Sequence, residues 1–215
     1  MGRREALALV RVGFAVLTLV AIAYQLSVSA GTGRLDLVNF FSYFTILSNL
    51  LAAAVLLVGA ARSMHTPSPT WDLVRGQAVV VMTVTLVVFA LLLADTDVDV
   101  TTSWVDTVVH RLFPAVVILD WLVDPPASAI GPRRSLVWLA APLAWLGYTM
   151  IRGALTAWYP YPFLDPADGG YGPVAVTVAA ILAFGVVLCV IVAAVGDALR
   201  SRRLVPLPAE ASTAG

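Results

Sequence analysis

Two residues suited to acyl transfer lie in separate apolar segments of the sequence. Thr45 lies in FFSYFTILSNLL (40–51), and His110 lies in WVDTVVHRLFPAVVILDWLV (104–123). A threonine hydroxyl becomes a nucleophile when a base within hydrogen-bonding distance takes its proton as it attacks a carbonyl. Histidine side chains titrate near neutral pH, which suits His110 to take that proton and return it to a leaving alcohol. The pair therefore predicts nucleophilic attack on an acyl group.

Several other polar residues are candidates for supporting roles. Asp106 precedes His110 by one helical turn, a spacing that allows its carboxylate to orient the imidazole. A negatively charged oxygen formed at the attacked carbonyl needs hydrogen-bond donors, and the Asn49 amide and the guanidinium groups of Arg111 and Arg152 are candidates. The full set of supporting candidates is Ser42, Asn49, Asp106, Arg111, Tyr148 and Arg152.

A polar stripe runs along the segment that contains Thr45. Successive helical residues advance by about 100°, so Ser42, Thr45 and Asn49 are expected within about 60° of one another. Small polar side chains also let membrane helices approach and hydrogen-bond, so packing alone explains such a stripe. Packing explains a histidine, an arginine and an aspartate in one apolar segment less well, because such groups are costly in lipid and mark function.

The composition indicates an integral membrane protein. Of the 215 residues, 60% are hydrophobic and 12% are charged, and the mean hydropathy is +0.91, whereas about 25% of residues are charged in soluble domains. Six segments approach the ~20 apolar residues that a membrane-crossing helix needs. We expect an all-α bundle of six transmembrane helices in one domain (1–203), followed by a disordered cytoplasmic tail (204–215). The approximate spans are 6–28, 39–60, 74–94, 104–123, 135–155 and 174–195.

Arginines concentrate on one side of this topology. The N-terminus, the second and fourth loops and the C-terminus contain Arg3, Arg4, Arg62, Arg75, Arg133, Arg134, Arg200, Arg202 and Arg203. The opposite loops carry mainly aspartates, among them Asp95, Asp97 and Asp99. By the positive-inside rule, both termini are expected in the cytoplasm. We expect a multi-pass protein of the cell membrane, in the bacterial cytoplasmic membrane.

The net charge and the cysteine content limit which partners and cofactors the sequence indicates. The formal net charge is zero, which gives no indication of a nucleic-acid partner. The single cysteine, Cys189, provides neither a disulfide framework nor a thiolate cluster for iron or zinc. One intramembrane histidine, His110, does not supply paired haem ligands. We therefore expect no cofactor and no metal site, with membrane lipids as the partners. The oligomeric state is left open.

The expected topology places Thr45 and His110 at matched depth. The second and fourth segments both run inward, and each residue lies six positions after the start of its segment, about 9 Å deep at 1.5 Å per residue. The fifth segment runs outward and brings Tyr148 and Arg152 to the same layer. The outer loop 156–173 then follows, and its aromatic residues are suited either to anchor the protein at the headgroup level or to close over a site.

Three motifs resemble those of a known family. FSYFTILSN in the second segment, HRLFPAVVILDW in the fourth and WYPYPFLD after the fifth are similar to motifs of the androgen-induced-gene family, which includes the androgen-dependent TFPI-regulating protein. The pattern is most similar to that of the six-helix bacterial relatives. The resemblance implies a membrane threonine hydrolase that cleaves fatty-acyl esters, such as fatty acid esters of hydroxy fatty acids. By motif position, it assigns the catalytic residues to Thr45 and His110.

Two other functions fit the same residues. A proton-coupled small-molecule transporter would use His110, Arg111 and Asp120 as a relay. Asp120 lies about 15 Å deeper than His110, and the intervening PAVVIL contains no ionisable residue. A non-catalytic lipid-binding protein or scaffold would use its polar interior only for packing. The hydrolase predicts that replacing Thr45 or His110 removes an activity, whereas the scaffold predicts a loss of stability alone.

Overall fold

The computed structural model describes residues 2–33, 35–62, 68–93, 102–167 and 169–204, and all secondary structure in these ranges is helical. The all-α class expected from the sequence is therefore confirmed for the described residues. Most of the expected tail (205–215) and the aspartates of the loop 94–101 lie outside them. Four helical segments are long and apolar enough to cross a membrane: α1 (Arg3–Gly31), α3 (Phe44–Ala61), α4 (Pro69–Val88) continued by the π-helical turn η1 (Phe89–Leu93), and α9 (Tyr171–Leu204).

Two further helical runs consist of shorter pieces. The first comprises α5 (Ser103–Thr107), the π-helical turn η2 (Val108–Leu112) and α6 (Phe113–Val123). The second comprises α7 (Pro132–Ser135), the 3-10 turn η3 (Leu136–Leu139) and α8 (Ala140–Thr156). These runs coincide with the expected spans 104–123 and 135–155, but turns of a different pitch interrupt each of them.

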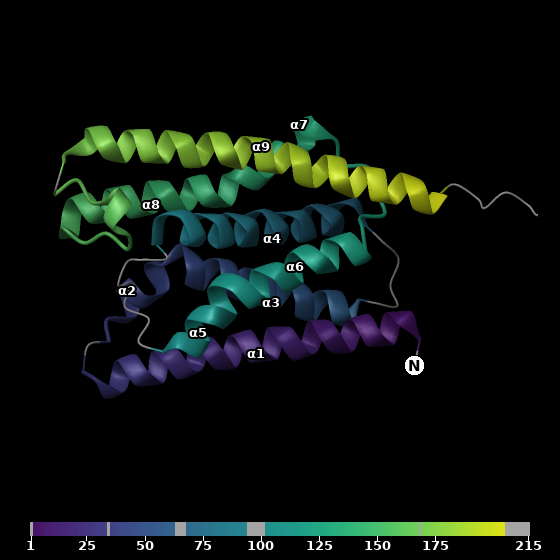
Figure 1. Ribbon diagram of the computed structural model, residues 1–215, viewed down its shortest axis with the longest axis horizontal. Coiled ribbons are helices and arrows are strands. Elements are labelled where there is room, and N and C mark those ends of the chain that lie inside the picture. The colour runs from purple at the N-terminus through teal and green to yellow at the C-terminus, as the bar shows by residue number, and fades with distance from the viewer. Residues whose placement is uncertain (1, 34, 63–67, 94–101, 168, 205–215) are drawn as a thin grey trace, which may run out of the picture.

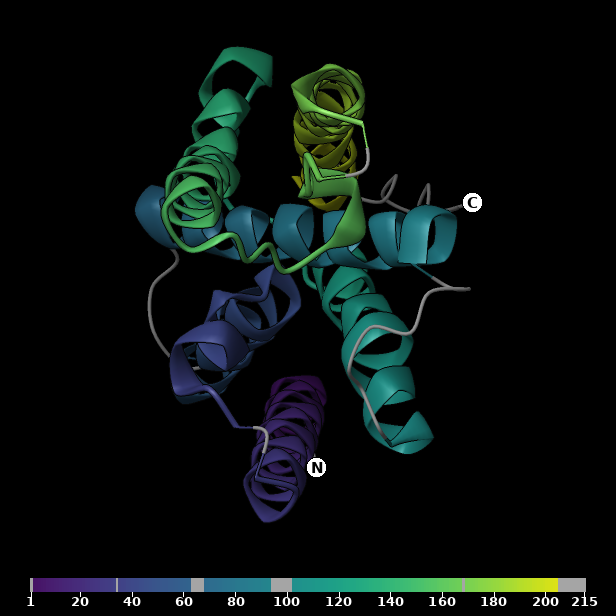
Figure 2. The same cartoon turned by 90° about the vertical axis from the view of Figure 1, so that its left-hand side faces the viewer.

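The long segments lie side by side along the longest axis of the molecule, and the chain reverses direction between successive segments (Figure 1). The start of α1 and the end of α9 consequently lie at the same end, where Arg3 and Arg203 both donate to the carbonyl of Val123. The central helix is α4, which packs against α3 and α6 on one side and against α9 on the other (Figure 2). The core includes Ala15, Ala52 and Ala78, small residues that allow close helix packing.

The expected span 39–60 is not one helix. The chain forms α2 (Leu37–Ser42), becomes extended at Tyr43 (φ −67°, ψ 129°) and begins α3 at Phe44. The carbonyl of Ser42 accepts a hydrogen bond from Trp145 Nε1 at 2.9 Å, a tertiary partner that replaces the backbone N–H of a continuous helix. The expectation that Ser42 shares a helical face with Thr45 is therefore wrong, because the two residues lie in different helices.

An ionic cluster holds three helices together at the end where α1 begins. Arg11 Nε lies 2.6 Å from one oxygen of Asp120, and Arg75 Nη2 lies 3.1 Å from the other. Arg11 also contacts Asp124 at 2.7 Å. The side chains of Arg11, Arg75 and Asp120 are buried. The cluster thus joins α1, α4 and α6 and gives Asp120 two arginine partners.

The charge on Asp124 should make this end of the bundle sensitive to acid. Burial alone would raise the pKa of the Asp124 carboxyl, but the charges of Arg75 and Arg11 lower it below its usual value. A carboxyl with a lowered folded-state pKa stabilises the protein above its unfolded-state pKa, and this contribution is lost as the pH falls through the folded-state pKa. Thermal unfolding should show Asp124→Asn to be less stable than the wild type at pH 7, with the gap closing below about pH 4. If the two proteins differ equally in stability at neutral and at acidic pH, the Asp124 charge does not have this stabilising role.

Candidate active site

Thr45 occupies the second position of α3, directly after the break at Tyr43. The first backbone hydrogen bond of α3 runs from the Leu47 N–H to the Tyr43 carbonyl, so the N–H of Thr45 has no partner within the helix. Helix N-termini carry a partial positive charge that stabilises nearby negative charge. The break in the span therefore places the threonine hydroxyl where an oxygen that gains negative charge is favoured.

His110 lies in the π-helical turn η2, just before Pro114. In this turn the Phe113 N–H donates to the Val108 carbonyl, five residues back. Pro114 has no N–H, so the next carbonyl in that register, that of Val109, lacks a backbone donor. Single π-turns inside α-helices frequently occur at functional sites. The local sequence thus widens the helix at His110 and leaves the neighbouring Val109 carbonyl to be satisfied from outside the helix.

Thr45, His110 and Asp106 form a connected hydrogen-bonded chain. Thr45 Oγ1 lies 3.2 Å from His110 Nε2, and His110 Nδ1 lies 2.8 Å from Asp106 Oδ1. An ionised carboxylate only accepts hydrogen bonds, so Nδ1 carries the proton shared with Asp106 and a neutral ring accepts the threonine proton at Nε2. Thr45 and His110 are 7% and 4% exposed. This arrangement matches the geometry of a nucleophile, a general base and an orienting carboxylate.

Neighbouring side chains hold the imidazole and its carboxylate in place. The ring of Phe89 stacks on His110 with a centroid distance of 4.0 Å and an interplanar angle of 11°. Arg111 Nη1 bonds the second oxygen of Asp106 at 2.8 Å, and its guanidinium lies over the Phe89 ring. The Arg111 guanidinium, which the sequence suggested as an oxyanion donor, is thus paired with Asp106 on the side of the imidazole away from Thr45.

Asn49 joins the two segments that supply the site. Its Nδ2 donates to the carbonyl of Thr45 at 2.8 Å and to that of Val109 at 3.1 Å. The second bond satisfies the carbonyl that Pro114 leaves without a donor. Both amide hydrogens are therefore engaged, so Asn49 positions α3 against η2 and is not a free oxyanion donor.

The remaining sequence candidates are Ser42 and Tyr148, which bond each other, and Arg152, which bonds Asn39. Ser42 Oγ lies 2.8 Å from the Tyr148 hydroxyl, and both residues border the break at Tyr43 from different helices. Arg152 Nη2 donates to Asn39 Oδ1, and its guanidinium lies over the ring of Trp158. These contacts support α2 and the outer loop, and none of them reaches Thr45 or His110.

Tyr161 was missed by the sequence analysis and lies directly on Thr45. Its hydroxyl accepts the Thr45 N–H at 3.2 Å and lies 3.3 Å from Thr45 Oγ1. Burial raises the pKa of Tyr161, so the hydroxyl keeps its proton at neutral pH. A carbonyl attacked by Thr45 Oγ1 would come within reach of this donor. The motif WYPYPFLD contains the residue, but nothing in the sequence distinguishes Tyr161 from the other loop aromatics.

Two cavities meet at Thr45 and Tyr161. The polar cavity, of about 190 Å³, is lined by the end of α1, α2, η2 and the outer loop, and its polar lining residues include Gln25, Ser29, Thr32, Asp36, Asn39 and His110. The apolar cavity, of about 70 Å³, lies among α3, α4, η1, α8 and α9, and its lining includes Val84, Phe89, Trp145, Leu146, Val178 and Leu182. Thr45 therefore borders a polar cavity and an apolar one.

The comparisons with known proteins add no relatives. No family model matches the chain, and neither a curated protein nor a solved structure shows significant similarity to it. The assignment of the site rests on its geometry.

Tyr161→Phe should lower kcat by about 10²- to 10³-fold, as expected for the loss of one oxyanion donor. The phenyl ring keeps the stacking of Tyr161 on Phe163, so the melting temperature should change little. Tyr159→Phe, in the same loop, is the matched control and should retain activity. Equal kcat values for the two variants would contradict an oxyanion role for Tyr161.

Asp106→Asn should lower kcat by about 10³-fold, because an amide next to Nδ1 no longer favours the tautomer whose Nε2 accepts the threonine proton. Thr107→Ala provides a control one residue away, since its hydroxyl bonds the Ser103 carbonyl outside the triad. Steady-state hydrolysis by both purified variants tests the role. A decrease below about threefold for Asp106→Asn would show that the carboxylate is dispensable.

Proposed function

We propose that this protein is an integral membrane hydrolase that cleaves fatty-acyl esters with Thr45 as nucleophile and His110 as general base. The observation that carries the proposal is the buried chain from Thr45 Oγ1 through His110 to Asp106. The family resemblance implies the same pair and suggests fatty acid esters of hydroxy fatty acids among the substrates.

The proposed reaction proceeds in two acyl transfers. Thr45 Oγ1 attacks the ester carbonyl carbon while its proton passes to His110 Nε2. The Tyr161 hydroxyl donates to the oxyanion, and Asp106 stabilises the imidazolium. Collapse of the tetrahedral intermediate breaks the ester C–O bond, and His110 returns the proton to the leaving alcohol. Water then attacks the acyl-threonine with His110 again as base, which releases the fatty acid and restores the threonine hydroxyl.

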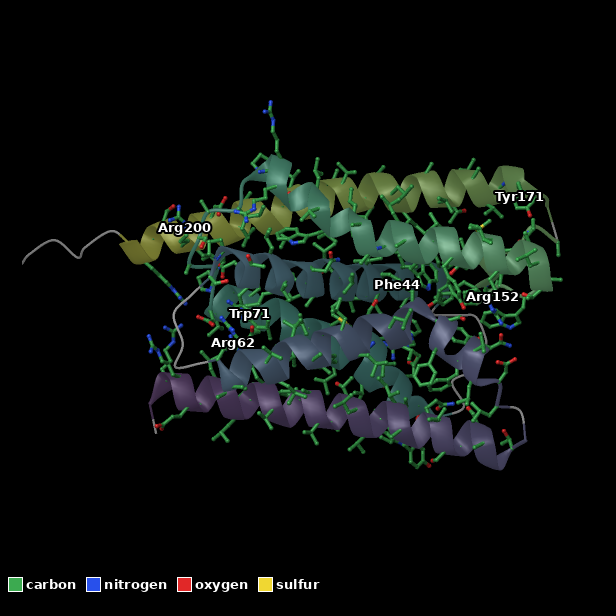
Figure 3. The ribbon with its side chains drawn as sticks, turned by 180° about the vertical axis from the view of Figure 1, so that it is seen from behind. Phe44, Arg62, Trp71, Arg152, Tyr171 and Arg200 are labelled. Carbon is green, nitrogen blue, oxygen red and sulfur yellow. The ribbon has the colours of Figure 1, made fainter. Side chains whose placement is uncertain are left out.

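We further propose six transmembrane segments with both termini in the cytoplasm of a bacterial cell. Large apolar side chains are exposed on α1, α8 and α9, among them Leu9, Leu155 and Val176. Figure 3 shows Arg62 and Arg200 at one end of the bundle and Arg152 and Tyr171 at the other. The end with the arginine-rich loops would face the cytoplasm, which puts the Thr45 site in the outer leaflet half.

Labelling with a lipid-like fluorophosphonate tests the proposal. The detergent-purified wild type should be labelled on Thr45, and Thr45→Ala and His110→Ala should lose the label. Thr83→Ala is the matched control, because Thr83 is also a threonine in an apolar helix, where its hydroxyl donates to the Val79 carbonyl. Labelling that persists in Thr45→Ala, or a folded wild type that is never labelled, would contradict the proposed nucleophile.

A further inference from the structure

The two cavities at Thr45 differ in their access to the general base. Thr45 and Tyr161 line both of them, whereas His110 lines only the polar cavity. In the proposed reaction, His110 must deliver a proton to the departing alkoxide and later activate the water that replaces it. The leaving alcohol and the hydrolytic water therefore belong in the polar cavity, which leaves the apolar cavity for the acyl chain.

The apolar cavity suits an acyl chain because its polar groups are already engaged. The Thr85 hydroxyl donates to the Val81 carbonyl, and Trp145 Nε1 donates to the Ser42 carbonyl. Most of the remaining wall is aliphatic or aromatic, including Leu146, which lies in the same apolar cluster as Val178. Burial of each methylene of a chain in such a cavity is favourable.

The polar cavity has hydrogen-bonding groups and a negative charge. Gln25, Ser29 and Thr32 line it from α1 and the turn that follows, and Asp36 and Asn39 line it from the other side. No lysine or arginine is among its lining residues within the described part of the chain; the guanidinium of Arg152 lies behind two of them, bonded to Asn39 and over the ring of Trp158. A neutral alcohol with several hydroxyl groups finds partners here, whereas a carboxylate meets the like charge of Asp36.

We infer that the substrate is a fatty-acyl ester of a neutral polyhydroxy alcohol, such as a monoacylglycerol, with its acyl chain in the apolar cavity and its alcohol in the polar one. This inference rests on the proposed function and narrows its substrate. This preference would distinguish the protein from hydrolases that prefer an ester whose alcohol portion is itself a fatty acid.

The acyl side is tested by filling the apolar cavity. Leu146→Trp should lower the ratio of kcat/KM for oleoylglycerol over butanoylglycerol by about tenfold or more, because only the long chain loses its site. Leu155→Trp, on the same helix but 80% exposed, is the control and should leave the ratio unchanged. Val178→Phe provides a smaller filling on α9 if the tryptophan variant does not fold. An unchanged ratio in the folded filling variant would overturn the acyl assignment.

The alcohol side is tested by removing the charge of Asp36. The wild type should hydrolyse oleoylglycerol at least about tenfold more efficiently than the oleoyl ester of hydroxystearic acid. Asp36→Asn should narrow this preference, and because asparagine also caps helices well, it should keep the bond to the Asn39 N–H. Asp165→Asn, which likewise removes a carboxylate bonded to a loop N–H, should leave the preference unchanged.

The outcomes separate this inference from the proposed function. If the wild type prefers the hydroxystearate ester, or if Asp36→Asn leaves the substrate preference unchanged, the inference is overturned. Thr45-dependent hydrolysis would still stand. A folded wild type that hydrolyses none of these esters would overturn both.

Discussion

Thr45→Ala should lower kcat for ester hydrolysis by about 10³- to 10⁴-fold, because the variant lacks the oxygen that forms the acyl intermediate. The loss should appear in kcat at unchanged folding, since the hydrogen-bond partners of Thr45 Oγ1 in the described part of the chain are the site residues His110 and Tyr161. Thr45→Ser keeps a hydroxyl at the same carbon and should retain measurable activity. The assay is steady-state hydrolysis of oleoylglycerol by detergent-purified protein.

Two controls make this result specific. Thr83→Ala removes a threonine hydroxyl from α4 and should leave kcat within about twofold of the wild type. His110→Ala should match the loss in Thr45→Ala, and the double variant should be no worse than either single variant, because residues that act as a unit are not additive. Additive losses in the double variant would show that the two residues act independently.

Asp120→Asn should lower the free energy of unfolding by about 3–5 kcal/mol, the cost of removing one partner from a buried ion pair. Without the Asp120 charge, the buried guanidinium groups of Arg11 and Arg75 would keep the partly exposed Asp124 as their carboxylate partner among the described residues. Chemical unfolding in a constant detergent background measures the change. Glu5→Gln, an exposed carboxylate near the same end of the bundle, should change the stability by less than about 0.5 kcal/mol.

The same variant tests the proton-relay alternative. If Asp120 has only a structural role, the fraction of Asp120→Asn that remains folded should hydrolyse esters with the wild-type kcat. A stable Asp120→Asn protein that has lost activity would contradict the structural role and favour a relay from His110 to the opposite end of the bundle.

The sequence predicted the triad because its main signals are local. Asp106 and His110 are one helical turn apart, so their contact follows from helix geometry alone. The pairing of Thr45 with His110 was expected from equal depth in two segments that run in the same direction. Their side chains do meet, at 3.2 Å, although the continuous helix from residue 39 on which the depth was counted is broken at Tyr43.

The features of the fold and of the site that the sequence did not predict depend on tertiary contacts. The break at Tyr43 depends on Trp145, about a hundred residues away, which bonds the Ser42 carbonyl. Arg11 lies inside an expected span, and its importance emerges only when α6 places Asp120 against it. Tyr161 reaches Thr45 because the outer loop folds inward, and no local periodicity encodes that approach. The role of Asn49 likewise depends on the carbonyl that Pro114 leaves free in η2.

The most direct test of the account is to trap the acyl-enzyme and locate it by mass spectrometry. The wild type is mixed with the p-nitrophenyl ester of oleic acid, quenched in acid within the burst of p-nitrophenol release, and digested. The account predicts an oleoyl group on the peptide that contains Thr45 and no such adduct in Thr45→Ala. A p-nitrophenol burst with the oleoyl group on a different residue, and the same burst in Thr45→Ala, would contradict it.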